Sequence, residues 1–358
     1  GIWTTRNGGR RLFPGNTRII MRKCMGTVNA VICKADGFDV SGGKLMKVFV
    51  TGVAGQLGHD VMNELNKRGY EGIGSDIAEK YSGVKDGTPV TSMPYVQMDI
   101  TDAKAVEEKI AAAAPDVVVH CAAWTAVDLA EDEDKVEKVR AINATGTEYI
   151  AKICQKLDCK LVYLSTDYVF DGQGTEPWKP DCKDYKPLNV YGVTKLEGEI
   201  AVSQRLSKYF IVRIAWVFGK NGKNFIKTML NVGKSHDRIT VVNDQIGTPT
   251  YTFDLARLLV DMIETDKYGY YHVTNEGGYI SWYDFTKEIF RQAVELGHPE
   301  YSEERLSVVP VTTEEYGISK AVRPFNSRLD KSKLLENGFT PLPTWQDALA
   351  RYLKELEF

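Results

Sequence analysis

Residues 47–58 read Lys-Val-Phe-Val-Thr-Gly-Val-Ala-Gly-Gln-Leu-Gly, and this stretch decides the fold. A short β-rich run leads directly into three glycines, Gly52, Gly55 and Gly58, in the spacing Gly-x-x-Gly-x-x-Gly. Residues 56–68 then have the pattern of a helix. Glycines between a strand and a helix let the backbone approach a pyrophosphate, whose charge is favoured at the positive helix N-terminus. We therefore expect a dinucleotide at this turn, rather than a tight turn that binds nothing.

Short apolar runs continue to alternate with helical patterns as far as about residue 216. The expected strands are 47–51, 71–76, 95–99, 117–121, 161–165 and 211–216, and the expected helices are 56–68, 102–114, 132–155 (with a candidate break at Asn143) and one that carries Tyr191. Apolar strands that alternate with helices are typical of a parallel sheet covered on both faces. The sequence therefore predicts an α/β fold, a doubly wound parallel sheet of the Rossmann type.

After Gly219 the alternation becomes less regular. Helices are expected at 224–232, 252–264, 281–295 and 344–356, and short strands at 239–242 and 270–273. Loops that contain proline and glycine separate these elements. We expect residues 46–219 to bind the dinucleotide and residues 220–358 to form mainly a smaller mixed α/β substrate lobe, with some segments returning to the sheet. Ligands of open α/β sheets bind at the carboxyl ends of the strands, where this lobe would hold a second ligand.

The composition is that of an ordinary globular protein. Of 358 residues, 43% are hydrophobic and 26% charged, and the formal net charge is −3. This charge gives no electrostatic case for nucleic acid as a partner. No apolar run approaches the roughly 20 residues that cross a bilayer. The six cysteines lack paired metal spacing, so we expect reduced thiols in a cytoplasmic protein rather than disulfides or zinc.

The first 45 residues differ from the rest. They contain eight Lys or Arg against only Asp36 and Asp39. A basic, acid-poor leader could be a transit peptide, but this one lacks serine richness and a clear amphipathic period. We expect a disordered or loosely docked extension, with Met46 as the ancestral start.

Asp76 is the first candidate contact for the adenosine half of the cofactor. It lies at the end of the second expected strand, 18 residues past Gly58, where a carboxylate can accept hydrogen bonds from a ribose. Its charge disfavours a 2′-phosphate and so favours NADH over NADPH, although Lys80 nearby weakens this inference. We keep both NADPH and NADH as candidate cofactors.

Further cofactor contacts are expected in the glycine turn and after the third and fourth strands. They are Gln56 and Leu57 in the turn, Asp99 and Ile100 beside the adenine ring, and the small residues Ala122 and Ala123. A solvated helix cap is the alternative for Asp99.

Tyr191 and Lys195 are the candidate catalytic pair. Residues four apart share one face of a helix, so the phenol and the ammonium can point into one pocket. A nearby ammonium favours the phenolate and lowers the tyrosine pKa, which suits proton transfer. Thr166 follows the fifth strand and would hydrogen-bond a substrate carbonyl oxygen, while Lys195 would also hold the nicotinamide ribose. Asn143, in the middle of a helical pattern, is either a buried polar support for this site or a cap at a helix break.

Several specific motifs surround these residues. They are Leu-Val-Tyr-Leu-Ser-Thr-Asp-Tyr-Val-Phe-Asp-Gly at 161–172, Pro-Leu-Asn-Val-Tyr-Gly-Val-Thr-Lys-Leu-Glu-Gly-Glu at 187–199, Cys-Ala-Ala-Trp-Thr-Ala-Val-Asp at 121–128, Asn-Asp-Gln-Ile-Gly-Thr-Pro-Thr at 243–250 and Arg-Pro-Phe-Asn-Ser-Arg-Leu-Asp at 323–330. From Met46 to the C-terminus the chain resembles the dTDP-4-dehydrorhamnose reductase family of extended short-chain dehydrogenase/reductases. The resemblance implies reduction of the C4 ketone of dTDP-6-deoxy-L-lyxo-4-hexulose to dTDP-L-rhamnose, and a homodimer.

The resemblance also implies substrate contacts. They are Thr125, Thr166, Tyr168, Tyr191 and Trp216, with Asn224 on the diphosphate side. Core packing is the alternative for Trp216. Trp124 stands where the family often has tyrosine, a change that removes no catalytic group. Some family members carry magnesium at a dimer contact, but we can place no such site on these residues and assign no metal.

Two other functions remain open. Dehydratases and epimerases of the superfamily are one, because dehydratases generally carry an acid after the catalytic hydroxyl and Asp167 fits that position superficially. The other is a regulatory binding subunit, since the β subunit of methionine adenosyltransferase resembles this reductase family. The basic leader could serve such a role, whereas the intact set of Thr166, Tyr191 and Lys195 argues against it.

Overall fold

The computed structural model describes residues 17–24, 27–34 and 45–358, and the chain divides into two compact units, residues 1–45 and 46–358. In the first unit, β1 (Thr17–Cys24) pairs antiparallel with β2 (Thr27–Lys34). We did not predict this hairpin. Our expectations for the other residues of the leader lie outside the described residues.

The second unit is built on a seven-stranded sheet in which every strand pair is parallel. The strand order is β13-β8-β7-β6-β3-β4-β5. The strands are β3 (Lys47–Thr51), β4 (Glu71–Asp76), β5 (Tyr95–Gln97), β6 (Val117–His120), β7 (Lys160–Thr166), β8 (Tyr209–Ile214) and β13 (Gly269–His272). The predicted α/β class and parallel sheet are confirmed. We had assigned the 270–273 strand to the smaller lobe, but it is the seventh strand and pairs with β8.

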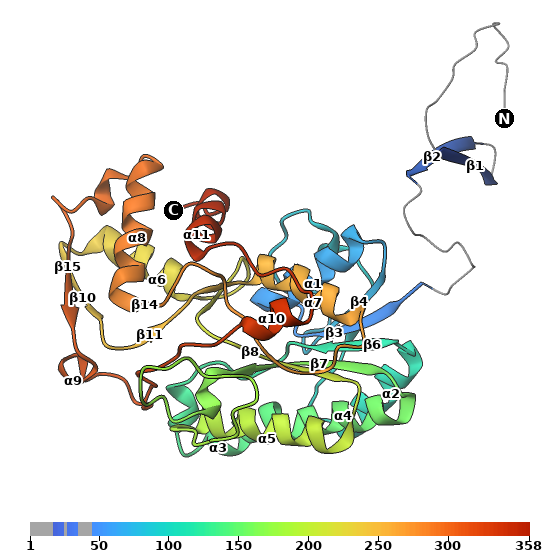
Figure 1. Cartoon of the computed structure of the whole chain (residues 1–358), viewed down its shortest axis with the longest axis horizontal. Coiled ribbons are helices and arrows are strands. Elements are labelled where there is room, and N and C mark those ends of the chain that lie inside the picture. Colours follow the sequence, from blue (N-terminus) through green and yellow to red (C-terminus); the bar gives the residue numbers. More distant parts are fainter. Residues whose placement is uncertain (1–16, 25–26, 35–44) are drawn as a thin grey trace, which may run out of the picture. The chain divides into compact units, whose positions relative to one another are not determined.

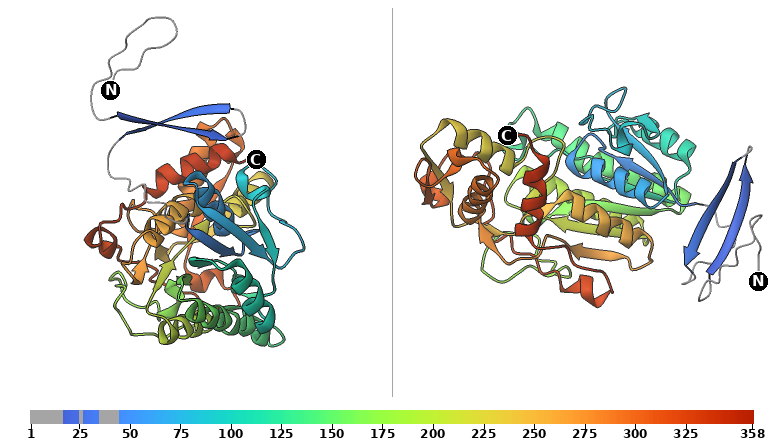
Figure 2. Two further views of the ribbon diagram at one scale, coloured as in Figure 1. Left: turned by 90° about the vertical axis from the view of Figure 1, so that its right-hand side faces the viewer. Right: turned by 90° about the horizontal axis from the view of Figure 1, so that it is seen from above.

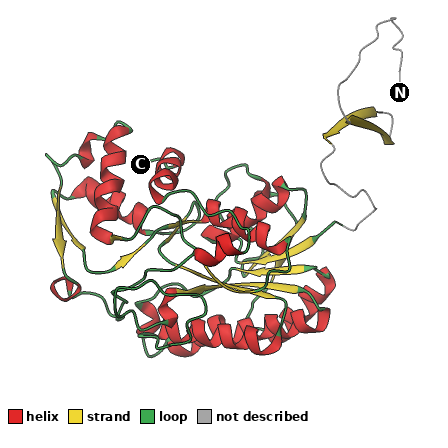
Figure 3. Cartoon of the chain, viewed as in Figure 1, coloured by secondary structure: helices red, strands yellow, loops and turns green. Residues whose placement is uncertain are grey.

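Helices cover both faces of this sheet (Figures 1 and 3). On one face α1 (Gln56–Lys67) packs against α7 (Thr252–Ile263). On the other lie α2 (Ala103–Ala113), α4 (Gly146–Leu157) and α5 (Val190–Arg205). Consecutive β6 residues therefore face two different apolar cores, and Val117, Val118 and Val119 are all buried. This two-sided burial explains the uninterrupted apolar run in the sequence.

The long helix expected over 132–155 is interrupted where Asn143 lies. It consists of α3 (Val136–Arg140), a π-helical turn (Ala141–Thr145) and α4. A π turn inserts one residue into a helix and is frequent at functional sites. The expected break is therefore a π turn rather than a capped end.

The smaller lobe has its own apolar core. Figure 2 shows the backbone of this lobe from two further sides. Its helices are α6 (Phe225–Ser235), α8 (Trp282–Glu295), α9 (Thr313–Tyr316) and α11 (Trp345–Glu355), and α10 (Ser332–Glu336) lies near β13. Its short strands form three pairs, β10 (Arg238–Val242) with β15 (Ser307–Val311), β9 (Val217–Phe218) with β12 (Thr250–Tyr251), and β11 (Ile246–Gly247) with β14 (Ile280–Ser281). Single 3-10 turns lie at Pro89–Thr91, Leu129–Glu131, Asp167–Val169 and Pro299–Tyr301.

Within the described part of the chain, no helix combines the length and apolar character needed to cross a membrane. The four cysteines whose side chains are described, Cys121, Cys154, Cys159 and Cys182, are free thiols.

Candidate active site

A cavity of about 940 Å³ lies at the carboxyl ends of the central strands and is bordered by the smaller lobe. Of the predicted site residues, all except Asn224 line it. They are Gly52, Gly55, Gln56, Leu57, Gly58, Asp76, Asp99, Ile100, Ala122, Ala123, Thr125, Thr166, Tyr168, Tyr191, Lys195 and Trp216. Residues that lie more than 160 positions apart in the sequence therefore line one cavity.

The glycine turn leaves room for a ligand backbone to approach. Gly52 has φ of +71°, and a Cβ atom there would lie 2.7 Å from the Ala122 nitrogen. A Cβ atom at Gly58 would lie 2.3 Å from the Gly52 carbonyl oxygen. Gly55 is the N-cap of α1, and no side chain of the described residues caps this helix end. The first N–H groups of α1 are therefore available to an anion, and the turn fits the pyrophosphate of a dinucleotide.

Asp76 and Asp99 line the cavity together with this turn. Asp76 Oδ2 accepts a 3.0 Å hydrogen bond from Ala54 N, and Oδ1 accepts one of 2.8 Å from Ile77 N. The carboxylate is therefore fixed beside the turn, where a ribose would lie. Asp99 Oδ1 accepts hydrogen bonds from the backbone and the hydroxyl of Thr101, so it stabilises a turn as well as lining the cavity. Lys80 is exposed and does not line the cavity.

Thr166, Tyr191 and Lys195 converge on the cavity from two elements. Thr166 is the last residue of β7, and the other two lie in the first turns of α5. Asn189 caps this helix, since its Oδ1 accepts a 2.8 Å hydrogen bond from Gly192 N. The Tyr191 phenol and the Thr166 hydroxyl hydrogen-bond each other. The predicted meeting of phenol, ammonium and alcohol is thus present in the fold.

The electrostatics of Tyr191 differ from our expectation. Burial, and after it the negative charge of Asp167, raise the pKa of Tyr191, while the hydrogen bond with Thr166 lowers it. Lys195 is itself buried, and loss of hydration lowers its pKa to about 8. Its ammonium donates a 2.6 Å hydrogen bond to Leu164 O and lies over the Tyr163 ring at 4.4 Å. The predicted lowering of the Tyr191 pKa by Lys195 is therefore corrected, because the ammonium is directed at a backbone carbonyl.

Asn143 supports this arrangement from the π turn. It is 1% exposed, and its Oδ1 accepts a 2.8 Å hydrogen bond from Trp124 N. Its amide donates to Thr194 Oγ1 at 3.1 Å, next to Lys195 on α5. The side chain therefore joins the loop after β6 to α5. Of the two alternatives for Asn143, the structure favours the buried polar support.

Asn224 lies in the smaller lobe and does not line the cavity. It is the N-cap of α6, where its Oδ1 accepts a 3.0 Å hydrogen bond from Lys227 N. Its amide nitrogen contacts Gly219 O at 3.1 Å and the Tyr352 hydroxyl at 2.8 Å. A third partner is Gln56 Oε1 at 3.0 Å. Because these buried contacts engage its polar atoms, we no longer assign Asn224 a substrate contact.

The cavity is also lined by residues that were not predicted, among them Trp282 and Arg323. Trp282, at the start of α8, stacks on Trp216 with ring centroids 3.7 Å apart and an interplanar angle of 19°. Arg323 forms a bidentate ion pair with Asp128 at 2.9 and 3.0 Å and hydrogen-bonds Tyr168. Arg323 stands in one of the motifs quoted above, whereas nothing in the sequence near Trp282 marked it as a site residue. Both are brought to the cavity by folding of the smaller lobe.

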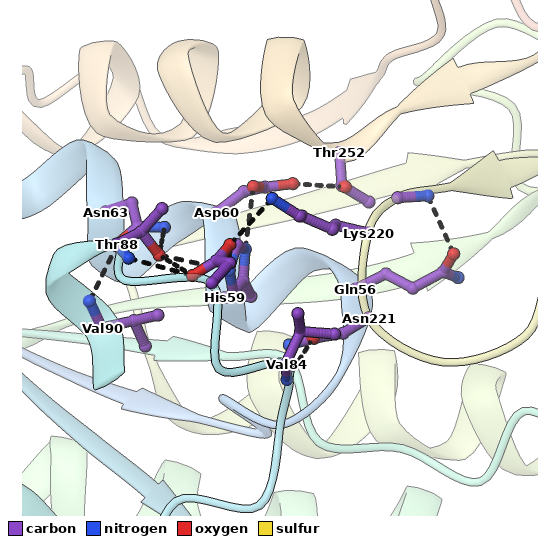
Figure 4. A network of polar contacts seen from close by, with 12 residues as sticks. Gln56, His59, Asp60, Asn63, Val84, Thr88, Val90, Lys220, Asn221 and Thr252 are labelled. Carbon is purple, nitrogen blue, oxygen red and sulfur yellow. Dashed lines mark hydrogen bonds and ion pairs between the residues drawn. The ribbon is translucent and has the colours of Figure 1, made fainter. Parts of the chain in front are cut away.

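A polar network behind the glycine turn joins two segments that border the cavity (Figure 4). The His59 ring lies 3.1 Å from both Asp60 Oδ1 and Asp86 Oδ2, and Lys220 forms a 3.0 Å ion pair with Asp86. Asn221, which lines the cavity, accepts a 2.7 Å hydrogen bond from Val84 N. The network thus fixes the loop after β4 to the segment before α6.

Among the described residues, no group of three or more His, Cys, Asp and Glu side chains is placed to hold a metal ion.

Comparisons with known proteins agree on one family. The family model described as RmlD substrate binding domain matches residues 46–358. Spore coat polysaccharide biosynthesis protein SpsK of Bacillus subtilis is 36% identical over 311 residues, which cover 87% of this chain and 98% of that protein. The dTDP-4-dehydrorhamnose reductase of Escherichia coli K12 is also 36% identical, with the same coverage of each chain, over 316 residues.

Solved structures give the same result. The dTDP-4-dehydrorhamnose reductase of Bacillus anthracis, in complex with NADP, has a TM-score of 0.74 and 37% identity. The related structure from Clostridium acetobutylicum has a TM-score of 0.76 and 38% identity. Each comparison covers 87% of this chain and 100% of the other. This chain therefore belongs to the dTDP-4-dehydrorhamnose reductase family.

Proposed function

We propose that this protein is an NAD(P)H-dependent reductase that converts the C4 ketone of dTDP-6-deoxy-L-lyxo-4-hexulose into the alcohol of dTDP-L-rhamnose. The observation that carries the proposal is the convergence of Thr166, Tyr191 and Lys195 on the cavity that the glycine turn also lines. Membership of the reductase family supports the substrate, and the NADP complex of the Bacillus anthracis relative supports the cofactor class.

The cofactor would be held at the carboxyl ends of β3 and β4. Gly52, Gly55 and Gly58 admit its pyrophosphate at the N-terminus of α1, and Asp76 accepts hydrogen bonds from the adenosine ribose. The chemistry that a bound nicotinamide supplies is a hydride for the carbonyl carbon. Asp99, Ile100, Ala122 and Ala123 complete the walls of this half of the cavity.

Side chains of the protein orient the ketone and donate the proton that the reduction requires. The Thr166 hydroxyl donates a hydrogen bond to the ketone oxygen, and the Tyr191 hydroxyl gives its proton to that oxygen as the carbonyl carbon accepts the hydride. The resulting phenolate regains a proton from solvent, so the enzyme returns to its starting state. Positioned proton transfer of this kind is worth roughly 10²- to 10⁴-fold in rate.

The smaller lobe would hold the sugar nucleotide. We assign Thr125, Tyr168 and Trp216 to contacts with the substrate, because all three line the cavity. We also propose that residues 46–219 bind the dinucleotide, that residues 220–358 mainly bind the substrate, and that the enzyme works as a cytoplasmic homodimer. Family resemblance supports the dimer. Light scattering tests it, and a monomer mass at micromolar concentration would contradict it.

The deciding assay follows the absorbance of NADH and NADPH with a panel of 4-keto-6-deoxy sugar nucleotides. A reductase consumes reduced cofactor in proportion to the substrate added. An epimerase or dehydratase of the same superfamily recycles a bound cofactor, so turnover without net oxidation would overturn the proposal.

A further inference from the structure

Asp167 is a buried carboxyl group that the proposed reaction does not use. It follows Thr166 directly, and the two side chains line the same cavity. Asp167 is 2% exposed and Thr166 is 5% exposed. Asp167 Oδ2 is buried and has no hydrogen-bond partner among the described residues. An acidic group in this state requires an explanation, since an unsatisfied buried polar atom costs about 1–3 kcal/mol and a buried charge more.

The hydrogen bonds of Thr166 suggest an explanation for the buried carboxyl group of Asp167. A hydroxyl has one proton to donate and two lone pairs to accept with. Thr166 Oγ1 accepts a 3.1 Å hydrogen bond from Tyr168 N, so one lone pair is engaged, and the Thr166 hydroxyl also hydrogen-bonds the Tyr191 phenol. The Asp167 Oδ1 atom lies 3.4 Å from the same oxygen. The remaining question is which of these two groups provides the shared proton.

The answer depends on the charge of Asp167. A carboxylate can only accept hydrogen bonds, so an ionised Asp167 would accept the one hydrogen bond that the Thr166 hydroxyl can donate. A neutral carboxyl group can donate to Thr166 Oγ1, and the Thr166 proton is then directed at the Tyr191 oxygen and is available to a ketone oxygen bound between them. A ketone oxygen only accepts, so Thr166 can bind it only in the second arrangement.

We propose that Asp167 is a positioning residue that acts in its protonated form, in which its own proton is directed at Thr166 Oγ1 and the Thr166 hydroxyl is turned towards the ketone oxygen. This inference rests on the proposed function.

The surroundings of Asp167 favour the neutral form near neutrality. Burial raises the pKa of Asp167 to about 7, against the opposing hydrogen bonds of Ser327 and Thr166. The ionisable groups that face it are the phenols of Tyr168 and Tyr191, and an ionised Asp167 raises the pKa of both. Arg323, which hydrogen-bonds Tyr168, is paired with Asp128. Ionisation of Asp167 would therefore both misdirect Thr166 and make Tyr191 a weaker proton donor.

The test compares the pH dependence of kcat/KM for ketone reduction in the wild type, Asp167→Asn and Asp167→Ala. We expect the wild type to lose activity about tenfold per pH unit above a pH of about 7. The Asp167→Asn variant keeps a hydrogen-bond donor for Thr166 at every pH. The pH at which its kcat/KM declines should therefore move towards about 8, the pKa of Lys195. Ala removes the donor, so kcat should fall about tenfold or more at pH 6 with little change in KM or in cofactor affinity. A decline near pH 7 that persists in Asp167→Asn overturns the inference.

The matched control is Asp134→Asn, which removes an exposed carboxylate and should keep the wild-type profile. Cofactor binding, measured by fluorescence titration, shows whether each variant is folded. If a variant does not fold, infrared spectroscopy of the wild type decides, because a protonated carboxyl band that titrates near pH 7 is expected and its absence contradicts the inference. A wild type that oxidises no reduced cofactor at any pH refutes the proposed function instead, so the two failures are distinguishable.

Discussion

The Lys195 ammonium donates a 2.6 Å hydrogen bond to the carbonyl oxygen of Leu164, two residues before Thr166. This bond ties α5 to the end of β7, and so helps to fix Tyr191 and Lys195 relative to the strand that carries Thr166. The ammonium is buried yet lines the cavity, where a nicotinamide ribose can replace or share this contact. Lys195 thus has a structural partner within the fold.

Replacement of Lys195 by Met should weaken dinucleotide binding. A hydrogen bond to a charged group is worth about 1.5–3 kcal/mol, so the dissociation constant should rise roughly tenfold to a hundredfold. In the wild type, affinity should decrease as the pH rises through about 8, because the charged form that donates to the ribose is lost there. Fluorescence titration measures both effects. Lys152→Met, on the exposed face of α4, is the control, and equal affinity in the two variants would contradict the assignment.

Tyr191→Phe deletes one hydroxyl and leaves the ring in place. We expect kcat for ketone reduction to fall roughly 10²- to 10⁴-fold, since the proton donor is lost. Cofactor affinity should change little. Stopped-flow absorbance and fluorescence titration give the two quantities, and the exposed Tyr316→Phe is the matched control. Full turnover by Tyr191→Phe would show that the proton comes from another group.

Asp76→Ala should shift cofactor preference towards NADPH. The carboxylate lies beside the ribose position and repels a 2′-phosphate, an interaction worth about 1 kcal/mol or more at contact distance, so the ratio of kcat/KM for NADPH over NADH should rise at least about fivefold. The ratio itself is the readout, because loss of the hydrogen bonds from Ala54 and Ile77 affects both cofactors alike. Glu79→Ala serves as the exposed control. An unchanged ratio would mean that Asp76 does not meet the ribose.

Gly58→Ala should be more damaging to stability than Gly55→Ala. A Cβ atom at Gly58 meets the Gly52 backbone at 2.3 Å, whereas at Gly55 the nearest atom is 3.2 Å away. Backbone cannot give way as a side chain can, so Gly58→Ala should lower Tm by several degrees, at roughly 2–4 °C per kcal/mol in a domain of this size. Thermal unfolding, monitored by circular dichroism, measures the Tm of each variant. Equal Tm values would indicate that the turn and α1 can move apart.

His59 should make the free energy of unfolding depend on pH. Burial alone lowers its pKa, but the hydrogen bonds and negative charges of Asp60 and Asp86 outweigh burial and raise it. A raised folded-state pKa gives stability that is complete below the unfolded value of 6.5 and is lost as the pH rises through the folded value. His59→Asn should therefore destabilise the protein by on the order of 1–3 kcal/mol at pH 5.5 and by less at pH 9.

Urea unfolding at the two pH values tests this expectation, with the exposed His236→Asn as control. The same loss at both pH values would indicate that His59 contributes through packing rather than charge.

Much of the sheet was predictable because the sequence patterns that indicate its strands and turns extend over only a few neighbouring residues. The run of valines in β6 and the glycines after β3 depend on backbone preference and on burial from both sides. β15 was not predictable in this way, because Pro310 lies within it and proline is excluded from central strands. It is tolerated in the pair of β15 with β10, which has only two strands.

The sequence alone determined the class of sheet, the glycine cradle and the shared helix face of Tyr191 and Lys195. Each follows from chain geometry over a few residues, which neighbours distant in sequence do not alter. Tertiary structure decided that Asn224 packs inside the lobe, that Lys195 is directed at Leu164, and that Asp167 is buried with an unpartnered oxygen. Desolvation and hydrogen-bond partners depend on which distant segments meet, and only the folded chain specifies those contacts.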